Sequence, residues 1–386
     1  MKVEGKEISV FSFMFAAGCA LGLQTAESES VCMLSFTFSI LLAAISKLQL
    51  SALKHTSKIL KIGNVSDSTA LIPAFFFAGL SGSIASSFPG APQADWFLPK
   101  AASVSSAYLK ECIDSIPFKD KCCNAIVKTF ITGDRSDLPH DLTEAFRKSG
   151  ASHLLALSGM HLGVIYIILS RILSILGNSP FAIRIRSATC ICSAGFYTII
   201  TGAGPSIVRA FLFIFLNESA KCMGRKTAHV NTFCSALMIQ LVLNPENIVS
   251  AGFQLSYLAM AGIYFLYPHI EKWYSSIETI TGRIINNTIE KTTVKKGVMQ
   301  ILWNATALSV SCQIFTAPAA WIHFRSFPEY FLITNLTATP LTTVVINASI
   351  PAIILQATGL CPEVLVKTSE WMIHLLTESI KTIGSL

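Results

Sequence analysis

The sequence predicts an all-α fold: a polytopic helical membrane protein with about 10–11 transmembrane helices plus amphipathic surface helices. Composition and the length of the apolar runs predict this class. Hydrophobic residues make up 52% of the 386 residues and charged residues 13%, and the mean hydropathy is +0.57. A soluble globular protein carries about 25% charged residues. So few charges could not cover a water-exposed surface, which excludes an ordinary soluble enzyme, a disordered chain and a fibrous repeat.

Apolar runs long enough to cross a bilayer recur along the whole chain. A transmembrane helix needs about 20 mostly apolar residues. The runs that approach this length are 8–25, 31–47, 69–88, 151–178, 181–202, 205–222, 230–245, 250–268, 299–322, 328–355 and 362–384. The first run resembles a signal peptide, but Glu4 and Glu7 dilute its basic start and a second apolar run follows. We therefore expect an uncleaved first span.

Basic residues alternate between successive loops. Lys and Arg occur at the N-terminus and near 47–61, 171–186, 221–226 and 272–296, whereas the loops near 25–30, 203–204 and 246–249 have none. Basic loops stay in the cytoplasm. The asymmetry therefore places the N-terminus in the cytoplasm and, with an odd number of spans, the C-terminus on the extracytoplasmic side. The same loops are the first explanation for the net charge of +7, and a surplus that also helps a polyanion is the second.

The chain is expected to divide into three segments. Residues 1–88 form N-terminal transmembrane helices, 89–150 an extracytoplasmic or interfacial amphipathic segment, and 151–386 the main transmembrane domain. In the middle segment an apolar stripe beside lysines is typical of a helix lying at the membrane surface. The stripe consists of Ile113, Ile116, Ile126, Val127, Phe130 and Ile131, beside Lys119, Lys121 and Lys128.

A polar run interrupts the apolar segment at 152–163. It contains His153, Ser158, Gly159 and His161, and Gly163 lies four residues after Gly159, a spacing that lets another helix come close. On one continuous helix, His153, Ser158 and His161 would share roughly one face. Two interpretations stay open: a polar stripe that lines a conduit, or a packing face whose polar groups bond to neighbouring helices.

Other polar residues lie inside apolar runs. Arg209 follows a break at Gly202–Pro205, and it is either a functional intramembrane charge or a side chain that reaches the membrane surface from a helix end. Gln254 and Ser256 lie in the run at 250–268, and Asn335 lies in the run at 328–355.

The sequence contains no motif for catalysis, a metal or a cofactor. A P-loop, a Rossmann glycine pattern, an HExxH motif and zinc-ligand spacing are all missing. We therefore expect no catalytic residues, no metal and no cofactor. Cys112, Cys122 and Cys123 share one polar loop, where either one disulfide or free thiols fit an extracytoplasmic position.

Several of these blocks, in this order, resemble the ComEC/Rec2 competence family, the inner-membrane DNA-uptake channels of natural transformation. The two most specific blocks are His153–His161 and Gly252–Ser256. The others are Gly133–Ser136, Phe146–Gly150, Pro205–Ala210, Asn335–Leu336 and Pro340–Leu341. The resemblance covers roughly residues 120–345.

The resemblance implies that 151–386 is a competence-type channel domain that passes single-stranded DNA through the bacterial inner membrane. It implies a set of positions along the DNA path and a set at the interface. The path positions are His153, Ser158, Gly159, His161, Arg209, Gln254, Ser256 and Asn335, and the interfacial positions are Asp134, Arg135 and Arg147. The implied partners are single-stranded DNA, the lipid bilayer, a DNA receptor, a separate nuclease and a cytoplasmic helicase or single-strand-binding protein, and a homo-oligomer stays open.

The sequence also departs from the larger members of that family. They carry an external OB-like domain and a C-terminal β-lactamase-like metal domain, and neither is expected here, so we expect no nuclease activity in this chain. Two other functions stay as alternatives. One is an intramembrane serine hydrolase using Ser158 and His161, although no orienting acid lies near them in sequence. The other is a small-solute transporter with a broken helix at Gly202–Pro205.

Overall fold

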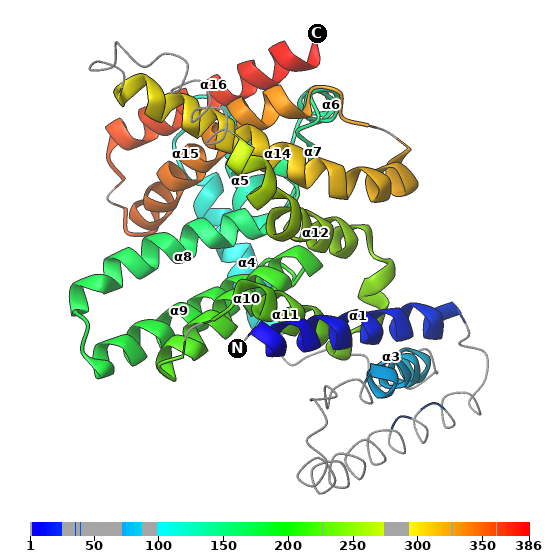
Figure 1. Ribbon diagram of the computed structural model, residues 1–386. Coiled ribbons are helices and arrows are strands. Elements are labelled where there is room, and N and C mark those ends of the chain that lie inside the picture. Colours follow the sequence, from blue (N-terminus) through cyan, green and yellow to red (C-terminus); the bar gives the residue numbers. More distant parts are fainter. Residues whose placement is uncertain are drawn as a thin grey trace, which may run out of the picture. The chain divides into compact units, whose positions relative to one another are not determined.

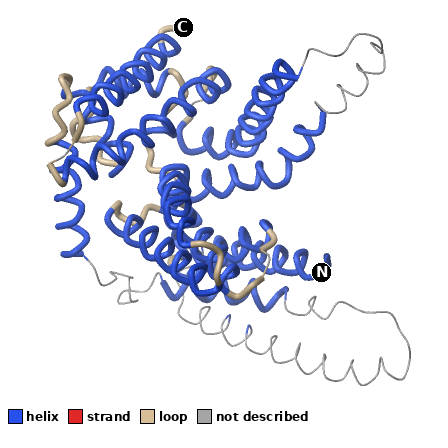
Figure 2. Tube along the Cα trace, turned by 90° about the vertical axis from the view of Figure 1, so that its left-hand side faces the viewer, coloured by secondary structure: helices blue, strands red, loops and turns tan. Residues whose placement is uncertain are grey.

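The structure of the chain is a computed structural model. It describes residues 2–24, 72–86, 99–225, 227–273, 293–325, 327–359 and 361–386, together with Ser35 and Ser39. All regular elements in these residues are helices (Figure 2). The expected span at 31–47, apart from those two serines, and most of the basic loops at 47–61 and 272–296 lie outside the described residues.

Three described segments are long and apolar enough to cross a membrane. They are Gly159–Leu176, Met299–Phe324 and Phe331–Ala357, and shorter apolar helices lie at Val10–Leu23, Phe75–Ile84 and His229–Leu243. The chain is therefore an all-α membrane protein, as the composition predicts. The number of spans stays a prediction. The expected span at 362–384 forms an amphipathic helix, α16 (Glu363–Gly384), with an ion pair between Glu363 and Lys367.

The described chain forms two compact units. The first consists of Met1–Phe97 and Leu212–Gln254, and the second of Leu98–Phe211 and Leu255–Leu386. The chain passes from one unit to the other inside α10 (Pro205–Cys222) and again inside α12 (Ala251–Ala261). The three segments expected from the sequence stay a prediction.

Glycines set the packing of the first unit, which contains α1 (Lys2–Gln24), α3 (Ile72–Ser86), α11 (His229–Leu243) and the short helix η3 (Pro245–Val249). A Cβ added to Gly18 would lie 1.9 Å from the carbonyl oxygen of Phe76. One added to Gly79 would lie 2.2 Å from that of Phe15. Only glycine permits this approach, so α1 and α3 touch backbone to backbone, as small residues allow in membrane bundles.

The second unit holds most of the remaining helices (Figure 1). They are α4 (Pro99–Asp114), α5 (Lys121–Thr132), α6 (His140–Lys148), α7 (Ser152–Leu155), α8 (Gly159–Leu173), η2 (Ser174–Leu176), α9 (Pro180–Ile200), the π-helical turn η4 (Gly262–Leu266), α14 (Thr293–Phe324), α15 (Phe331–Ala357) and α16. The largest buried side chains include Phe130 of α5, Phe146 of α6 and Ile346 of α15. They belong to one hydrophobic core shared by α4 to α8, α15 and α16.

The apolar stripe of the middle segment lies inside this core. Ile113, Ile126 and Phe130 are buried, and they pack in one cluster with Ile346 of α15 and Ile373 of α16. α15 and α16 therefore cover these residues, so the stripe packs against protein, and the interfacial position of the segment stays a prediction. Burial of each such side chain stabilises the fold by about 1.5–3 kcal/mol.

The expected continuous span at 151–178 is broken. The helix α7 ends at Leu155, Ala156 is extended with φ −79° and ψ 131°, and α8 begins at Gly159. Ser158 is the N-cap of α8. A capping serine favours a new helix start over a continued helix, so His153 does not share a helix with Ser158 and His161.

Candidate functional site

The polar run ends in a capping box at the start of α8. The Ser158 side chain accepts a hydrogen bond from the backbone N–H of Met160, at 3.3 Å. In return, the backbone N–H of Ser158 donates to Nδ1 of His161, at 3.0 Å. A capping box normally uses Glu or Gln at the position that His161 takes here. The box therefore fixes both the helix start and the orientation of the imidazole.

His161 is buried with one ring nitrogen left over. Its side chain is 0% exposed, and its ring centroid lies 6.2 Å from that of Phe130. Because Nδ1 accepts a hydrogen bond, the neutral ring carries its proton on Nε2. Among the described residues Nε2 has no hydrogen-bond partner. A buried donor without a partner costs about 1–3 kcal/mol, so this N–H group is available for a ligand or a water molecule.

Arg209 lies beside the same helix start. A Cβ added to Gly159 would lie 3.3 Å from Nη2 of Arg209 and 3.1 Å from Cβ of Ala210. Glycine at position 159 therefore lets the first turn of α10 approach the first turn of α8. A Cβ at Gly163 would meet nothing within 4 Å, so the expectation that both glycines serve a close helix contact holds only for Gly159.

An aromatic ring completes this group of side chains. The guanidinium carbon of Arg209 lies 5.9 Å from the ring centroid of Tyr257. That distance is within the range of a cation–π interaction. We call Ser158, Gly159, His161, Arg209 and Tyr257 the α8 cluster. All five belong to the second unit.

The block Gly133–Ser136 packs against the turn before α8. Nε of Arg135 donates to the carbonyl oxygen of Leu155, at 3.2 Å. Gly133 has φ +77°, and an added Cβ would lie 2.5 Å from Cδ1 of Leu157. Only glycine adopts this left-handed conformation without backbone strain. Any other residue would also bring its Cβ into collision with the Leu157 side chain. The block therefore packs against the α7–α8 turn and holds it in place, and Arg135 contributes a hydrogen bond to the backbone of that turn.

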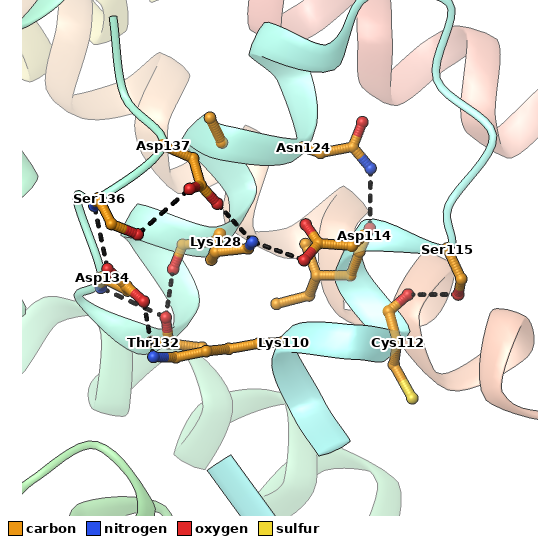
Figure 3. A network of polar contacts seen from close by, with 12 residues as sticks. Lys110, Cys112, Asp114, Ser115, Asn124, Lys128, Thr132, Asp134, Ser136 and Asp137 are labelled. Atoms are coloured by element: carbon orange, nitrogen blue, oxygen red, sulfur yellow. Dashed lines mark hydrogen bonds and ion pairs between the residues drawn. The ribbon is translucent and has the colours of Figure 1, made fainter. Parts of the chain in front are cut away.

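Asp134 belongs to a network of ion pairs around α5 (Figure 3). Its Oδ2 lies 2.6 Å from Nζ of Lys110, and its Oδ1 accepts the backbone N–H of Ser136 at 3.0 Å. The hydrogen bond from Lys110, with that from Ser136, holds the pKa of the Asp134 carboxyl well below its ordinary value. This residue, expected at the interface, is thus committed to protein partners.

Lys128 forms the centre of the same network. Its Nζ lies 2.6 Å from Oδ2 of Asp114 and 2.6 Å from Oδ2 of Asp137, and its side chain is 8% exposed (Figure 3). Burial lowers the lysine pKa, but the hydrogen bonds that the ammonium donates to the two carboxylates outweigh burial and raise it. The same contact with Lys128 lowers the pKa of Asp137. We call Lys110, Asp114, Lys128, Asp134 and Asp137 the α5 network.

Each of three further expected site residues, His153, Arg147 and Gln254, bonds to a neighbour on its own segment. His153 is exposed, with Nδ1 3.2 Å from the carbonyl oxygen of Gly150. Arg147 is exposed and binds Glu144 through two nitrogens, at 2.9 and 2.7 Å. Gln254 belongs to the first unit and donates from Nε2 to the carbonyl oxygen of Ile248, at 2.8 Å.

Ser256 and Asn335 resemble His161 in one respect. Ser256 Oγ and Asn335 Oδ1 are buried atoms that have no hydrogen-bond partner among the described residues. Buried polar groups usually find a partner, so each of these atoms is a candidate contact for a passing ligand. Their use in the function stays a prediction.

The structure also tests how the serine and the histidine would work as a hydrolase pair. Oγ of Ser158 lies 3.1 Å from Nδ1 of His161, within the reach of a nucleophile and its base. Nδ1, however, already accepts the Ser158 amide, and Oγ already accepts the Met160 amide. In the described part of the chain no carboxylate bonds to Nε2. This geometry fits a helix cap better than a catalytic pair.

Sequence reasoning missed two features of the site. Tyr257 directly follows the block Gly252–Ser256, but its contact with Arg209 is visible only in the fold. The hydrogen bond from the hydroxyl of Tyr197 to the carbonyl oxygen of Ile131, at 2.7 Å, had no sequence signal, because 66 residues separate the two. Cys112, Cys122 and Cys123 are free thiols.

Comparison with known proteins places these observations in a family. The family described as "Competence protein" matches residues 130–386, which is more than half of the chain. The chain is 25% identical over 218 residues to ComE operon protein 3 of Bacillus subtilis (strain 168), covering 56% of this chain and 24% of that protein. It is 24% identical over 224 residues to the uncharacterized protein YcaI of Escherichia coli (strain K12), covering 57% of this chain and 27% of that protein.

The chain thus spans about a quarter of the length of these curated relatives. No solved structure matches it. The matched region contains α6 to α16 and all five residues of the α8 cluster. The chain belongs to the competence protein family.

Proposed function

We propose that this chain conducts single-stranded DNA across the bacterial cytoplasmic membrane, and that the α8 cluster contacts the strand in transit. Membership of the competence family supports the proposal, together with the similarity to ComE operon protein 3 of Bacillus subtilis. The single observation that carries the site is the approach of Arg209 to the first turn of α8, the turn that also carries the capping pair Ser158 and His161.

The chemistry of this cluster suits a phosphodiester. A helix N-terminus favours negative charge. A guanidinium binds phosphate oxygens through charge-assisted hydrogen bonds. The imidazole N–H adds one neutral donor, and the ring of Tyr257 offers a surface on which a base can stack. Backbone contact without base-edge contacts is sequence-independent, as a channel for arbitrary DNA requires.

A low density of strong cations also suits a conduit. Each lysine or arginine that binds a phosphate releases counterions and adds affinity. Many such contacts in a row would hold the polyanion instead of letting it pass. The polar atoms that we place along the path are mostly neutral hydroxyls, amides and imidazole, from His161, Ser256 and Asn335. One arginine among neutral polar groups allows contact and release.

The orientation and the partners are part of the proposal. We place the N-terminus in the cytoplasm because the basic loops alternate along the sequence. The α8 cluster has no arrangement suited to cutting a strand. Conversion of duplex to single strand, capture outside the cell and pulling from inside therefore fall to partners: a separate nuclease, a DNA receptor, and a cytoplasmic helicase or single-strand-binding protein.

The proposal is tested by measuring DNA uptake in a bacterial strain whose own chromosomal copy of the gene is replaced by the gene for this chain or for a variant of it. Cells receive end-labelled linear DNA, and internalised single-stranded label is measured. Arg209→Gln should reduce uptake about tenfold to a hundredfold, since a charge-assisted hydrogen bond contributes about 1.5–3 kcal/mol. The matched control is Arg171→Gln, at the exposed far end of α8.

Both variants must accumulate in the membrane to the parental level. If Arg209→Gln takes up DNA as fast as the parent, the α8 cluster is not the DNA contact. If neither the parent nor any variant takes up DNA in a transformable host, the conduit proposal itself fails. Labelling of Ser158 by a fluorophosphonate probe would instead favour the hydrolase alternative, because its hydroxyl lies 3.1 Å from His161 Nδ1.

A further inference from the structure

A second group of polar side chains lies where the start of α5 meets α16. Asp120, Cys123 and His374 place a carboxylate oxygen, a thiol sulfur and an imidazole nitrogen within 4.8 Å of one another. Sγ of Cys123 lies 4.0 Å from Nε2 of His374. Cys123 is buried, whereas Asp120 and His374 are exposed. The group is thus open to solvent on one side and closed on the other.

Hydrogen bonds with the backbone hold Asp120 and its loop in position beside α16. Oδ1 of Asp120 accepts the backbone N–H of Cys122 at 2.9 Å and so caps α5. Oε1 of Glu370 accepts the backbone N–H groups of Lys119 at 3.0 Å and of Asp120 at 3.2 Å. Glu370 lies four residues before His374 on α16, so both side chains are neighbours on one helix face. Glu370 therefore fixes α16 against the loop that carries Asp120.

We propose that Asp120, Cys123 and His374 form a Zn²⁺ site that joins α5 to α16. Zinc binds thiolate sulfur, imidazole nitrogen and carboxylate oxygen, and sites with three protein ligands leave a fourth position open. The exposed side of the group gives that position to a water molecule. Calcium and magnesium are poor candidates, because both prefer oxygen ligands alone.

The spacing is close to that of a loaded site. Zn–S and Zn–N bonds of about 2.3 and 2.0 Å put tetrahedral ligand atoms about 3.5 Å apart. The 4.0 Å between sulfur and nitrogen requires only a small inward movement. Asp120 and His374 are exposed at the surface, so their side chains have room to make it.

The ligands come from distant parts of the sequence. The partners Cys123 and His374 are 251 residues apart, so no local cysteine or histidine pattern predicts them, and the sequence accordingly predicts no metal. A metal at this place would tie α16 to the core that packs against α5 and α15. The proposal concerns a structural site and stands independently of DNA conduction.

The experiment uses the purified full chain in detergent, without an affinity tag. Cobalt is titrated in place of zinc, because a tetrahedral cobalt site with a thiolate shows a charge-transfer band and visible d–d bands. The parent should show this spectrum at one cobalt per chain, and zinc should displace it. Cys123→Ser and His374→Gln should lose the charge-transfer band or weaken binding at least about tenfold, since even outer-shell partners cost that much.

Matched controls keep the test specific. Cys122→Ser removes the neighbouring thiol and His140→Gln removes an exposed histidine on α6, and both should bind cobalt like the parent. Circular dichroism checks helix content, and His374→Gln decides the matter if Cys123→Ser fails to fold, because its side chain is exposed. The proposal is overturned if the parent shows no thiolate band, if Cys123→Ser keeps it, or if Cys122→Ser abolishes it.

Discussion

The α5 network and the α8 cluster differ in whether their buried polar groups have hydrogen-bond partners. In the α5 network, Lys128 lies between two carboxylates at 2.6 Å and Lys110 binds Asp134 at the same distance. In the α8 cluster, the imidazole of His161 is held by a backbone amide through Nδ1, but Nε2 has no partner among the described residues. One region neutralises its charges locally, and the other leaves a donor unused.

This difference separates structural from functional polarity. Ion pairs that satisfy each other lower the cost of burying charge and stabilise a fold. A buried donor without a partner lowers stability and is kept where a ligand uses it. Asp134 makes an ion pair of the first kind with Lys110, and its interfacial role stays a prediction. We propose that His161 is a donor of the second kind, and the predictions below test that division.

The largest expected effect comes from removing both partners of Lys128. The double substitution Asp114→Ala and Asp137→Ala leaves a buried ammonium without a counter-charge, and should lower the free energy of unfolding by about 3 kcal/mol. Lys128→Met keeps the packing and leaves two half-exposed carboxylates in water, so it should cost only about 1 kcal/mol. Thermal unfolding of the detergent-solubilised protein measures both.

The exposed pair Glu144–Arg147 supplies the control for that experiment. Glu144→Gln should leave the unfolding temperature unchanged, because solvent screens this pair. If Lys128→Met were more destabilising than the double substitution, the burial of the ammonium would not be the cause. The contribution of the α5 network to stability would then not come from its ion pairs.

The next largest effect concerns His161. Glutamine is a usual capping-box residue at this position, so His161→Gln should preserve the helix start and the unfolding temperature. The substitution removes the Nε2 donor. DNA uptake should then fall about tenfold, because the loss of one hydrogen bond to a charged group costs about 1.5 kcal/mol. A parental uptake rate in a stable His161→Gln variant would reduce His161 to a capping residue.

A smaller effect is expected from the glycines of α8. Gly159→Ala brings a methyl group to 3.1 Å from Cβ of Ala210 and 3.3 Å from Nη2 of Arg209. A small shift relieves this contact, so uptake should fall about threefold through the displaced guanidinium. Gly163→Ala on the same helix meets nothing within 4 Å and should leave uptake unchanged. Equal effects from both substitutions would contradict the role of Gly159.

The smallest effect is a dependence of stability on acid. The folded pKa values of Asp134 and Asp137 lie below their ordinary values, so the stabilisation is present above about pH 4 and is lost as the pH falls through the lowered values. Solvent screening keeps this effect modest. Unfolding temperatures from pH 6 to pH 3 should fall less steeply in Lys128→Met than in the parent, since Asp137 then loses its partner. Equal slopes would count against the pairing.

The sequence predicted the class of the fold better than its packing. Few charges and long apolar runs sufficed for an all-α membrane protein, and the break at Gly202–Pro205 lies between α9 and α10, as expected. The stripe around Phe130 was identified as amphipathic, but the identity of its cover, α15 and α16, depends on contacts more than 200 residues away. Hydrophobic periodicity indicates that one face of a helix is buried, but it does not indicate which other helices cover that face.

The site was only partly accessible from the sequence. Ser158, Gly159, His161 and Arg209 were among the residues selected from the sequence, because polar residues within apolar runs are few, and their role stays a prediction. The expected polar stripe was not found, since a helix break at Ala156–Ser158 makes Ser158 and His161 a capping box. Tyr257 and the trio Asp120, Cys123 and His374 required the tertiary fold.

The most direct test of the central claim is cross-linking of DNA during uptake. Cells take up linear DNA substituted with bromodeoxyuridine, are irradiated while the strand is in transit, and the adducts on this protein are mapped by mass spectrometry. If the α8 cluster contacts the strand, adducts should form on peptides that contain His161, Arg209 or Tyr257. These adducts should be lost in Arg209→Gln. Adducts confined to other peptides, with uptake at the normal rate, would contradict the claim that the α8 cluster contacts the passing strand.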